Sequence, residues 1–337
     1  MKQSWVMGVT ASFLMAHPSQ PIRAFAEETS DFSKAYAAYE DRKLDEALAY
    51  AQKAVREQPT HVDVQALLGE LYYQRQDLTQ AKQSWEKALK LAPSRQDIRE
   101  RLDKLNRESQ VERDLSRSDT SPFVVRFARD QIPTSQGELR DILREVYRLI
   151  GQQVGYFPDH PITVLLYSEE EFNKVKGASH QAAGLYDGKI RLPLPVGEAA
   201  VWELKRVLWH EYTHALVHDL SRGRCPTWLN EGIATLQEAR VQPLDLSVVK
   251  EALHQGKLYT WNQLWNRRYE EADLKLQYTQ SHLIAAYLVK RWGWKPLAGL
   301  LNRLGQGYPI EDALQAEYRM ASAAIEKEWL LWLKRTL

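Results

Sequence analysis

Residues 201–220 read VWELKRVLWHEYTHALVHDL and are the most informative stretch of this 337-residue chain. The stretch reads as a single helix, and it contains an HExxH motif from His210 to His214. Residues four apart lie on one helical face, about 5–6 Å from each other. Two imidazoles at this spacing can therefore hold one metal ion at about 2.0–2.1 Å each. Glu211 projects beside that ion, where a carboxylate can act as a base toward water.

The residues that follow predict a second, shorter helix. Three residues that interrupt helices come directly after the first one: Ser221, Gly223 and Pro226. Thr227 can then cap a helix that begins at Trp228. Glu231 lies in the first turn of this helix, 17 residues after His214, and we expect it to face back toward the histidines.

Glu231 is the best candidate for a third metal ligand. With His210 and His214 it leaves a fourth position open for water, as catalytic zinc sites require and structural zinc sites do not. The pattern therefore predicts one zinc ion per chain. His218 extends the histidine ladder, but a rise of about 1.5 Å per residue separates it from His210 by about 12 Å, too far for one ion. We interpret His218 as a residue that ends the helix or supports a ligand.

Two nearby features bear on other metal patterns. A metzincin has glycine and histidine where this chain has Val217 and Leu220, so that class is excluded. Cys225 is the only cysteine, which excludes an intrachain disulfide. Its position close to the site allows a reactive thiol or a metal ligand, but we favour a small buried residue.

The N-terminal half repeats itself with a period of 34 residues. Residues 44–59 (LDEALAYAQKAVREQP) align with residues 78–93 (LTQAKQSWEKALKLAP). The matching positions are Ala47, Ala54 and Pro59 in the first copy and Ala81, Ala88 and Pro93 in the second. Small alanines let antiparallel helices approach closely, and each proline ends the second helix of its unit.

This pattern resembles the tetratricopeptide repeat and implies an all-helical domain over residues 31–112. Two repeats are fewer than the roughly three that independent stability needs. We therefore expect a helical extension to about Ser109, or the next domain, to cover one end. Two interpretations of the repeats stay open: a concave surface that binds a protein partner, and a helical spacer that caps the second domain.

The second half reads as mixed helix and strand. Residues 103–121 look like a helix end running into a linker, which places the second domain at 120–337. Strands are expected at 123–128 (FVVRFA) and 162–167 (ITVLLY), and a helix at 138–149. Leu185-Tyr186, an Asp-Gly turn and KIRLPL predict a hairpin, with Pro193 and Pro195 holding its second strand at a sheet edge. Helices dominate after Glu198, so the fold class is α+β.

These motifs together resemble gluzincin metallopeptidases of the peptidase-MA-like type. The resemblance covers roughly residues 121–337 and rests on four segments: HEYTHAL, WLNEGIA, GLYDGKIRLP and QYTQSHLIAAYLVKRWG. It implies a zincin-like domain in which His210, His214 and Glu231 bind zinc and Glu211 is the general base. It also implies that GLYDGKIRLP supplies the edge strand along which a peptide substrate extends.

Three further positions follow from the same resemblance. Tyr278 stands where related enzymes place a tyrosine that donates to the oxyanion, although it can equally be an aromatic core residue. His282, one turn later, can serve instead. Thr235 replaces the acidic residue that in many gluzincins supports the first histidine. Either Glu238 takes that role, or the site is held less tightly.

Composition limits the remaining possibilities. The net charge of +1 with no basic block gives no reason to expect nucleic acid as a partner. A basic start, an apolar run to Ala16 and Ala24-Phe25-Ala26 predict a signal peptide over residues 1–26. We therefore expect export to the periplasm or medium, with a cytoplasmic location as the alternative. No later apolar run is long enough to predict an integral membrane segment.

The sequence therefore predicts a zinc-dependent peptidase that acts on a peptide or protein. The alternative is a repeat-containing scaffold that binds zinc or peptide without cleaving it. Retention of Glu211 argues against the alternative, because zinc ligation does not need this carboxylate.

Overall fold

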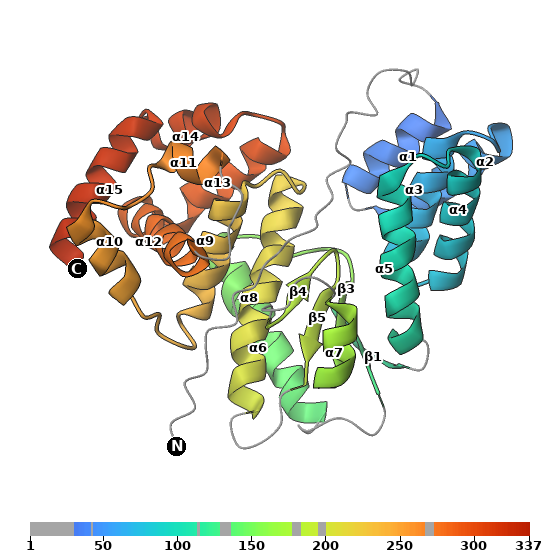
Figure 1. Ribbon diagram of the computed structural model, residues 1–337, viewed down its shortest axis with the longest axis horizontal. Coiled ribbons are helices and arrows are strands. Elements are labelled where there is room, and N and C mark those ends of the chain that lie inside the picture. The colour runs from blue at the N-terminus through green and yellow to red at the C-terminus, as the bar shows by residue number, and fades with distance from the viewer. Residues whose placement is uncertain are drawn as a thin grey trace.

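The computed structural model describes residues 30–41, 43–112, 115–128, 136–176, 183–194, 200–266 and 273–337. An N-terminal helical unit lies beside a larger unit of strands and helices (Figure 1). The expected signal peptide, residues 1–26, lies outside the described residues.

Five helices form the N-terminal unit: α1 (Asp31–Glu40), α2 (Leu44–Glu57), α3 (Val62–Gln74), α4 (Leu78–Leu91) and α5 (Gln96–Glu112). The alanines that recur with the 34-residue period lie on α2 and α4, and all four are buried. Their small side chains let α2 pack on α1 and α4 pack on α3. α5 is the expected extension, and it covers α4 through an apolar cluster that includes Trp85 and Leu102.

A five-stranded sheet follows, in the order β1-β2-β3-β5-β4. Its strands are β1 (Ser116–Thr120), β2 (Phe123–Phe127), β3 (Ile162–Tyr167), β4 (Leu185–Tyr186) and β5 (Ile190–Pro193). The three central strands run parallel, while β1 and β4 pair antiparallel at the two edges. The small sheet and its packed helices confirm the α+β class.

Two expectations about the strands are wrong. Residues 116–120 are not a linker but the edge strand β1, which forms because its main chain pairs with β2 although its side chains are polar. β5 is not an edge strand, because it lies between β3 and β4. Pro193 is tolerated there as the last residue of β5, and the next N–H, that of Leu194, donates to the Tyr167 carbonyl at 2.7 Å.

Helices cover both faces of the sheet. The side chains of β3 point alternately to one face and to the other, and both sets are covered. Val164 and Leu166 face a core shared with α6 (Gln136–Val154) and α8 (Ala200–Ser221). Leu165 and Tyr167 face α7 (Glu169–Val175) and the end of α5. The N-terminal unit therefore packs directly on one face of the sheet.

The remaining helices build the C-terminal part of the larger unit (Figure 1). They are α9 (Thr227–Glu238), α10 (Ser247–Gln255), α11 (Trp261–Asn266), α12 (Leu274–Trp292), α13 (Trp294–Gly305), α14 (Ile310–Tyr318) and α15 (Ser322–Thr336). α9 lies between α8 and α12 and packs along both. In the part of the chain that is described, none of the helices has the length and apolarity needed to cross a membrane.

Candidate metal centre

Helix α8 carries the HExxH motif and is buried through its centre. Every residue from Val207 to Val217 is buried, so tertiary packing holds the helix on all sides. The helix ends where Gly223 adopts a φ of +71° and its N–H donates to the His218 carbonyl at 2.9 Å. A left-handed glycine at this position lets the chain reverse directly after α8.

Helix α9 returns along α8 and brings Glu231 to the histidines. It begins at Thr227 rather than Trp228, with Pro226 at the N-cap position and no side-chain cap. The predicted capping role of Thr227 is therefore wrong. A proline at the helix start still presets the local φ, so the turn needs no capping hydroxyl.

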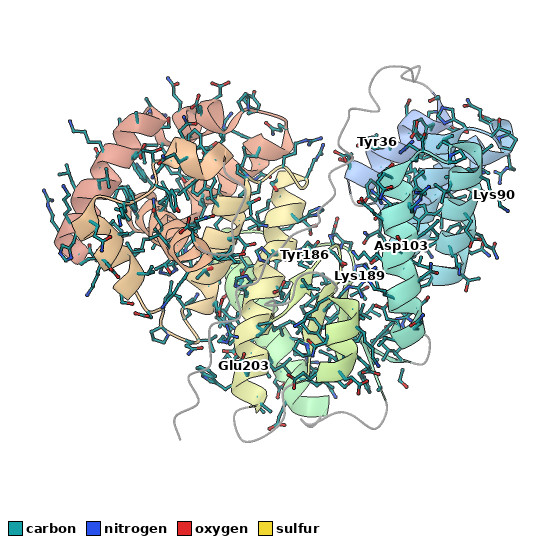
Figure 2. All side chains as sticks on the ribbon, viewed as in Figure 1. Tyr36, Lys90, Asp103, Tyr186, Lys189 and Glu203 are labelled. Atoms are coloured by element: carbon teal, nitrogen blue, oxygen red, sulfur yellow. The ribbon has the colours of Figure 1, made fainter. Side chains whose placement is uncertain are left out.

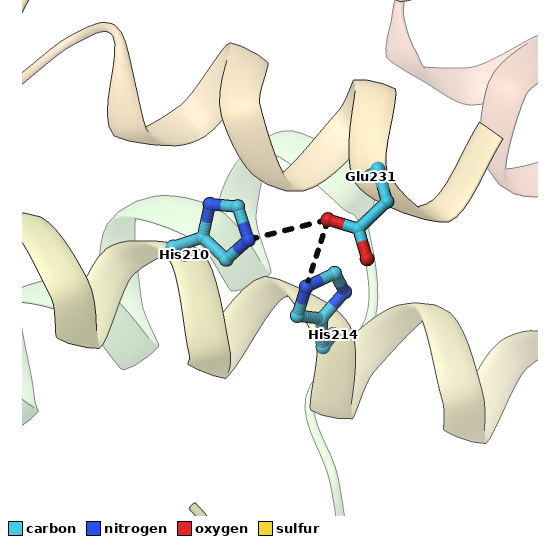
Figure 3. Close-up of side chains that lie close together, drawn as sticks. All are labelled: His210, His214 and Glu231. Atoms are coloured by element: carbon cyan, nitrogen blue, oxygen red, sulfur yellow. Dashed lines mark ion pairs between the residues drawn. The ribbon is translucent and has the colours of Figure 1, made fainter. Parts of the chain in front are cut away.

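Three side chains meet between α8 and α9 (Figure 3): His210, His214 and Glu231. Their ligand atoms all lie within 4.8 Å of one another. The Oε2 atom of Glu231 is 3.5 Å from Nε2 of His210 and 3.6 Å from Nε2 of His214. These distances exceed those of good N–H···O hydrogen bonds. By contrast, two donor atoms on a tetrahedral zinc ion at about 2.0–2.2 Å lie roughly 3.4 Å apart. The spacing therefore suits a shared divalent cation better than direct pairing.

Buried carboxylate oxygens mark the same place. Glu211 and Glu231 are both 0% exposed. Within the described residues, neither oxygen of either carboxylate has a hydrogen-bond partner. Buried polar atoms are normally satisfied, so the donor set of two imidazoles and a carboxylate fits a metal ion that would complete it.

The second nitrogen of each histidine has its own partner. Nδ1 of His210 lies 2.7 Å from Oε2 of Glu238, and Nδ1 of His214 lies 2.9 Å from Oδ1 of Asn230. With Nδ1 of each ring engaged, Nε2 is directed at the metal position. Of the two alternatives left open by Thr235, the structure selects Glu238 as the acidic partner of the first histidine.

Sequence reasoning missed two residues that order this arrangement. Arg206 pairs with Glu238 and also with Glu203, so it fixes the carboxylate that holds His210. Arg206 stands four residues before His210, so helical spacing alone places both residues on the same face of α8. Asn230 directly precedes Glu231, but only the packing of α9 on α8 shows that it faces His214.

Burial and the neighbouring carboxylates shift the pKa values of the groups at this site. Burial alone would lower the pKa of His210, but the carboxylates of Glu231 and Glu238 outweigh it and raise that pKa to about 10. Burial raises the pKa of the Glu211 carboxyl to about 8. Burial lowers the pKa of His214, so this second imidazole stays neutral and ready to bind a metal.

The edge of the sheet lies directly against Glu211. A Cβ atom built on Gly184 would come within 2.8 Å of Glu211 Cγ and Oε1, and within 2.7 Å of Val207 Cγ1. Gly184 immediately precedes β4, so the chain enters the edge strand in contact with the proposed base. Only a residue without a side chain allows this approach.

Comparison with known families agrees with this geometry. The profile of the Peptidase MA superfamily matches residues 145–335, more than half of the chain. The chain belongs to the Peptidase MA superfamily. A tetratricopeptide repeat profile matches residues 38–102, which confirms the predicted combination of repeats with a peptidase MA domain. No curated protein matches the sequence.

The structure also places three other residues that the sequence of this peptidase MA chain suggested as candidates for the site. Tyr278 is 9% exposed on α12, and its role as an oxyanion donor stays a prediction. His282 is buried on the same helix, where the Thr235 main chain contacts it, and burial lowers its pKa to about 4. His218 packs its ring on Tyr186 at 5.7 Å and is not part of the cluster.

Cys225 does not join the cluster either. Burial raises the pKa of its thiol, and Sγ lies 3.6 Å from the Pro226 carbonyl oxygen. A thiol with a raised pKa is a poor nucleophile and a poor metal ligand at neutral pH. Cys225 is partly buried and packs against the apolar core, so the expectation of a buried residue holds only in part.

Proposed function

We propose that this chain is a zinc-dependent peptidase of the gluzincin type. His210, His214 and Glu231 would hold one zinc ion, and Glu211 would be the general base. The strongest support is the spacing of about 3.5 Å from Glu231 Oε2 to each Nε2. That spacing corresponds to the edge of a tetrahedral zinc site rather than to a hydrogen-bonded pair.

The chain's own residues would divide the reaction between them. Zinc in such a site acts as a Lewis acid toward a carbonyl group and makes water more acidic. Glu211 would take a proton from the attacking water and deliver it to the leaving amine. The complete burial of Glu211 keeps bulk water away from this carboxylate. Glu238 and Asn230 would keep the imidazoles oriented throughout.

A polypeptide substrate is favoured by two observations. The superfamily is a peptidase superfamily. In addition, β4 is an edge strand that begins beside Glu211, so its outer main chain can pair with an extended peptide. Pairing along β4 would bring a peptide bond toward the proposed base.

The test is zinc content and peptide cleavage measured on the same samples. We expect about one zinc per chain in wild type, loss of zinc and cleavage in Glu231→Gln, and loss of cleavage alone in Glu211→Gln. Glu311→Gln is the matched control, because Glu311 is exposed on α14 and is not part of the His210–His214–Glu231 cluster. Zinc binding without cleavage would instead support the inactive scaffold. Absence of zinc would refute the proposed site.

Export is proposed separately, on the pattern of residues 1–26 alone. Mass spectrometry of the protein recovered from cell fractions tests it. A mature N-terminus at Glu27 outside the cytoplasm would support export, and an intact N-terminus in the cytoplasm would contradict it.

A further inference from the structure

The hairpin that carries the edge strand is held together by few pairings between its own two strands. β4 contains two residues, and its ladder to β5 consists of two residue pairs, Leu185 with Arg191 and Tyr186 with Ile190. The turn between them includes Gly188 at a φ of +94°. A ladder of this length is marginal by itself. Other parts of the molecule must therefore keep β4 beside Glu211.

Helix α8 supplies some of these contacts, because Gly184 lies against Glu211 and Tyr186 packs on His218. The helical repeats hold the turn and β5 through a buried cluster centred on Arg191. Arg191 lies on β5 and is 0% exposed. Its guanidinium pairs with Glu108 at 3.2 Å and with Glu112, both of which lie on α5. It also donates to the hydroxyl of Tyr73 on α3 at 2.8 Å. Two different helices of the repeat domain thus hold one side chain of the hairpin.

The turn itself is held from the same side. Lys104 on α5 pairs with Asp187 in the turn. The ammonium of Lys189 lies 3.5 Å from the centre of the Tyr73 ring, and Lys189 is fully buried. Figure 2 shows Lys189 on the side of the hairpin that faces α5. A Cβ on Gly188 would come within 2.5 Å of the Gln74 side chain, so the turn lies directly against α3.

The two surfaces complement each other in charge. The repeat domain contributes two acids and one base: Glu108, Glu112 and Lys104. The hairpin contributes one acid and two bases: Asp187, Lys189 and Arg191. Without the repeats, Arg191 would lose Glu108, Glu112 and the Tyr73 hydroxyl and would keep Asp187 and the Tyr167 hydroxyl as partners. Removing one partner from a buried ion pair is strongly destabilising. Other pairs between the two units, Asp41 with Arg222 and Glu40 with Arg224, are more exposed and contribute little.

We propose that the repeat domain is a positioning element of the peptidase: through the Arg191 cluster, it holds the hairpin so that β4 can receive substrate beside Glu211. That β4 receives a peptide substrate rests on the proposed function. That the repeats hold the hairpin in place does not depend on it. Tyr73, Glu108 and Glu112 are then positioning residues, and substrate binding along β4 depends on them although they lie on helices of another domain.

Two conservative substitutions test this role. Glu108→Gln removes a charge without changing shape, and Tyr73→Phe removes only the hydroxyl that accepts from Arg191 and donates to Glu108 at 2.9 Å. Their matched controls are Glu100→Gln, exposed on the same helix as Glu108, and Tyr72→Phe, whose hydroxyl accepts from Gln52. Amide hydrogen exchange, zinc content and peptide-cleavage kinetics are measured on all four variants and on wild type.

In Glu108→Gln and Tyr73→Phe, we expect exchange over residues 184–192 to accelerate about tenfold or more. Zinc content should stay at the wild-type level. The value of kcat/KM should fall by a similar factor, mainly through KM, because a mobile β4 weakens peptide binding. Both controls should behave as wild type.

Three outcomes would overturn the proposal. One is unchanged exchange and unchanged KM in both variants. Another is faster exchange spread evenly over α12 and the rest of the chain, which indicates a general loss of stability. The third is faster exchange at the hairpin with wild-type kinetics. A wild type that binds no zinc would refute the proposed function instead, and exchange at the hairpin would still report on the cluster.

Discussion

At the scale of single residues, the second nitrogen of each histidine governs how the site can hold an ion. Glu238 engages Nδ1 of His210 at 2.7 Å, and Arg206 holds Glu238 in turn. A histidine with such a carboxylate partner keeps one ring orientation and is a more basic ligand. Glu238 therefore supports the first histidine, and the threonine at position 235 does not leave it without an acidic partner.

Replacing this carboxylate should weaken metal binding without removing a ligand. We expect Glu238→Gln to lower zinc affinity by roughly 10–100-fold, the usual effect of losing such a partner. Competition with a chelator of known affinity measures the change. Glu311→Gln, which alters an exposed glutamate, should leave zinc affinity unchanged. Equal affinities in wild type and Glu238→Gln would show that Glu238 does not support the ligand.

Zinc binding should also release protons. The carboxylates of Glu231 and Glu238 raise the pKa of His210 to about 10, so the metal-free protein carries a proton there at pH 7. A metal ligand must be deprotonated, so binding has to displace that proton. Lower pH makes displacement harder, and zinc affinity should fall about tenfold per pH unit per proton released.

Calorimetry in two buffers of different ionisation enthalpy measures the released protons directly. We expect at least one proton per zinc at pH 7. A heat of binding that is the same in both buffers would contradict the prediction. Glu231→Gln removes a ligand and should abolish the binding signal, which ties the released proton to this site.

At the scale of elements, one close helix crossing places the third ligand. A Cβ atom on Gly232 would lie 2.5 Å from the carbonyl oxygen of Ser281, so α9 and α12 touch through their main chains. Main-chain atoms cannot move aside as the end of a side chain can. Gly232 directly follows Glu231, and this contact therefore sets how far Glu231 reaches toward α8.

Adding a methyl group at this crossing should push the two helices apart. We expect Gly232→Ala to lower the free energy of unfolding by about 1–3 kcal/mol and to weaken zinc binding, since Glu231 shifts with its helix. Urea unfolding and chelator competition measure the two effects. Gly299→Ala on α13 is the control, because its Cβ meets only the end of the Glu317 side chain. Wild-type stability in Gly232→Ala would show that the crossing tolerates a side chain.

At the scale of the whole molecule, the repeats and the peptidase domain share buried charges, so neither is expected to unfold alone. Separating them would break the buried ion pairs of Arg191 with Glu108 and Glu112. Zinc binds only the folded site and stabilises it by mass action. Its stabilising effect should therefore extend to the repeats.

Thermal unfolding followed by hydrogen exchange tests this coupling. We expect a single transition in wild type, and zinc should raise the unfolding temperature of α1–α5 together with that of α8 and α9. Glu231→Gln should abolish the shift in both regions. Two separate transitions, of which zinc moves only the second, would show that the domains are independent.

Several features were predictable because they depend on local geometry. The spacing of His210 and His214 places both rings on one helical face wherever the helix lies. The 34-residue period of alanines and prolines identifies the repeats, and the apolar run from Ile162 to Tyr167 identifies a buried strand. Each of these signals is carried by residues close together in the sequence.

The positions of strands in the sheet were harder to predict from the local sequence pattern. The polar residues 116–120 form a strand only because β2 offers its main chain. β5 lies inside the sheet because β4 pairs with its outer side, and the presence of Pro193 in β5 gave no sign of this pairing. Strand pairing is a property of two segments at once, so a single segment gives an incomplete prediction.

The sequence by itself thus determined the motif, the repeats, the fold class and the residues that can bind a metal. Tertiary structure alone decided that Glu238 and Asn230 orient the imidazoles, and that Arg191 joins the repeats to the edge-strand hairpin. These groups lie 16 to 118 residues apart along the chain. Helical spacing follows from the backbone within a few residues, whereas contacts across such distances exist only once the helices have packed.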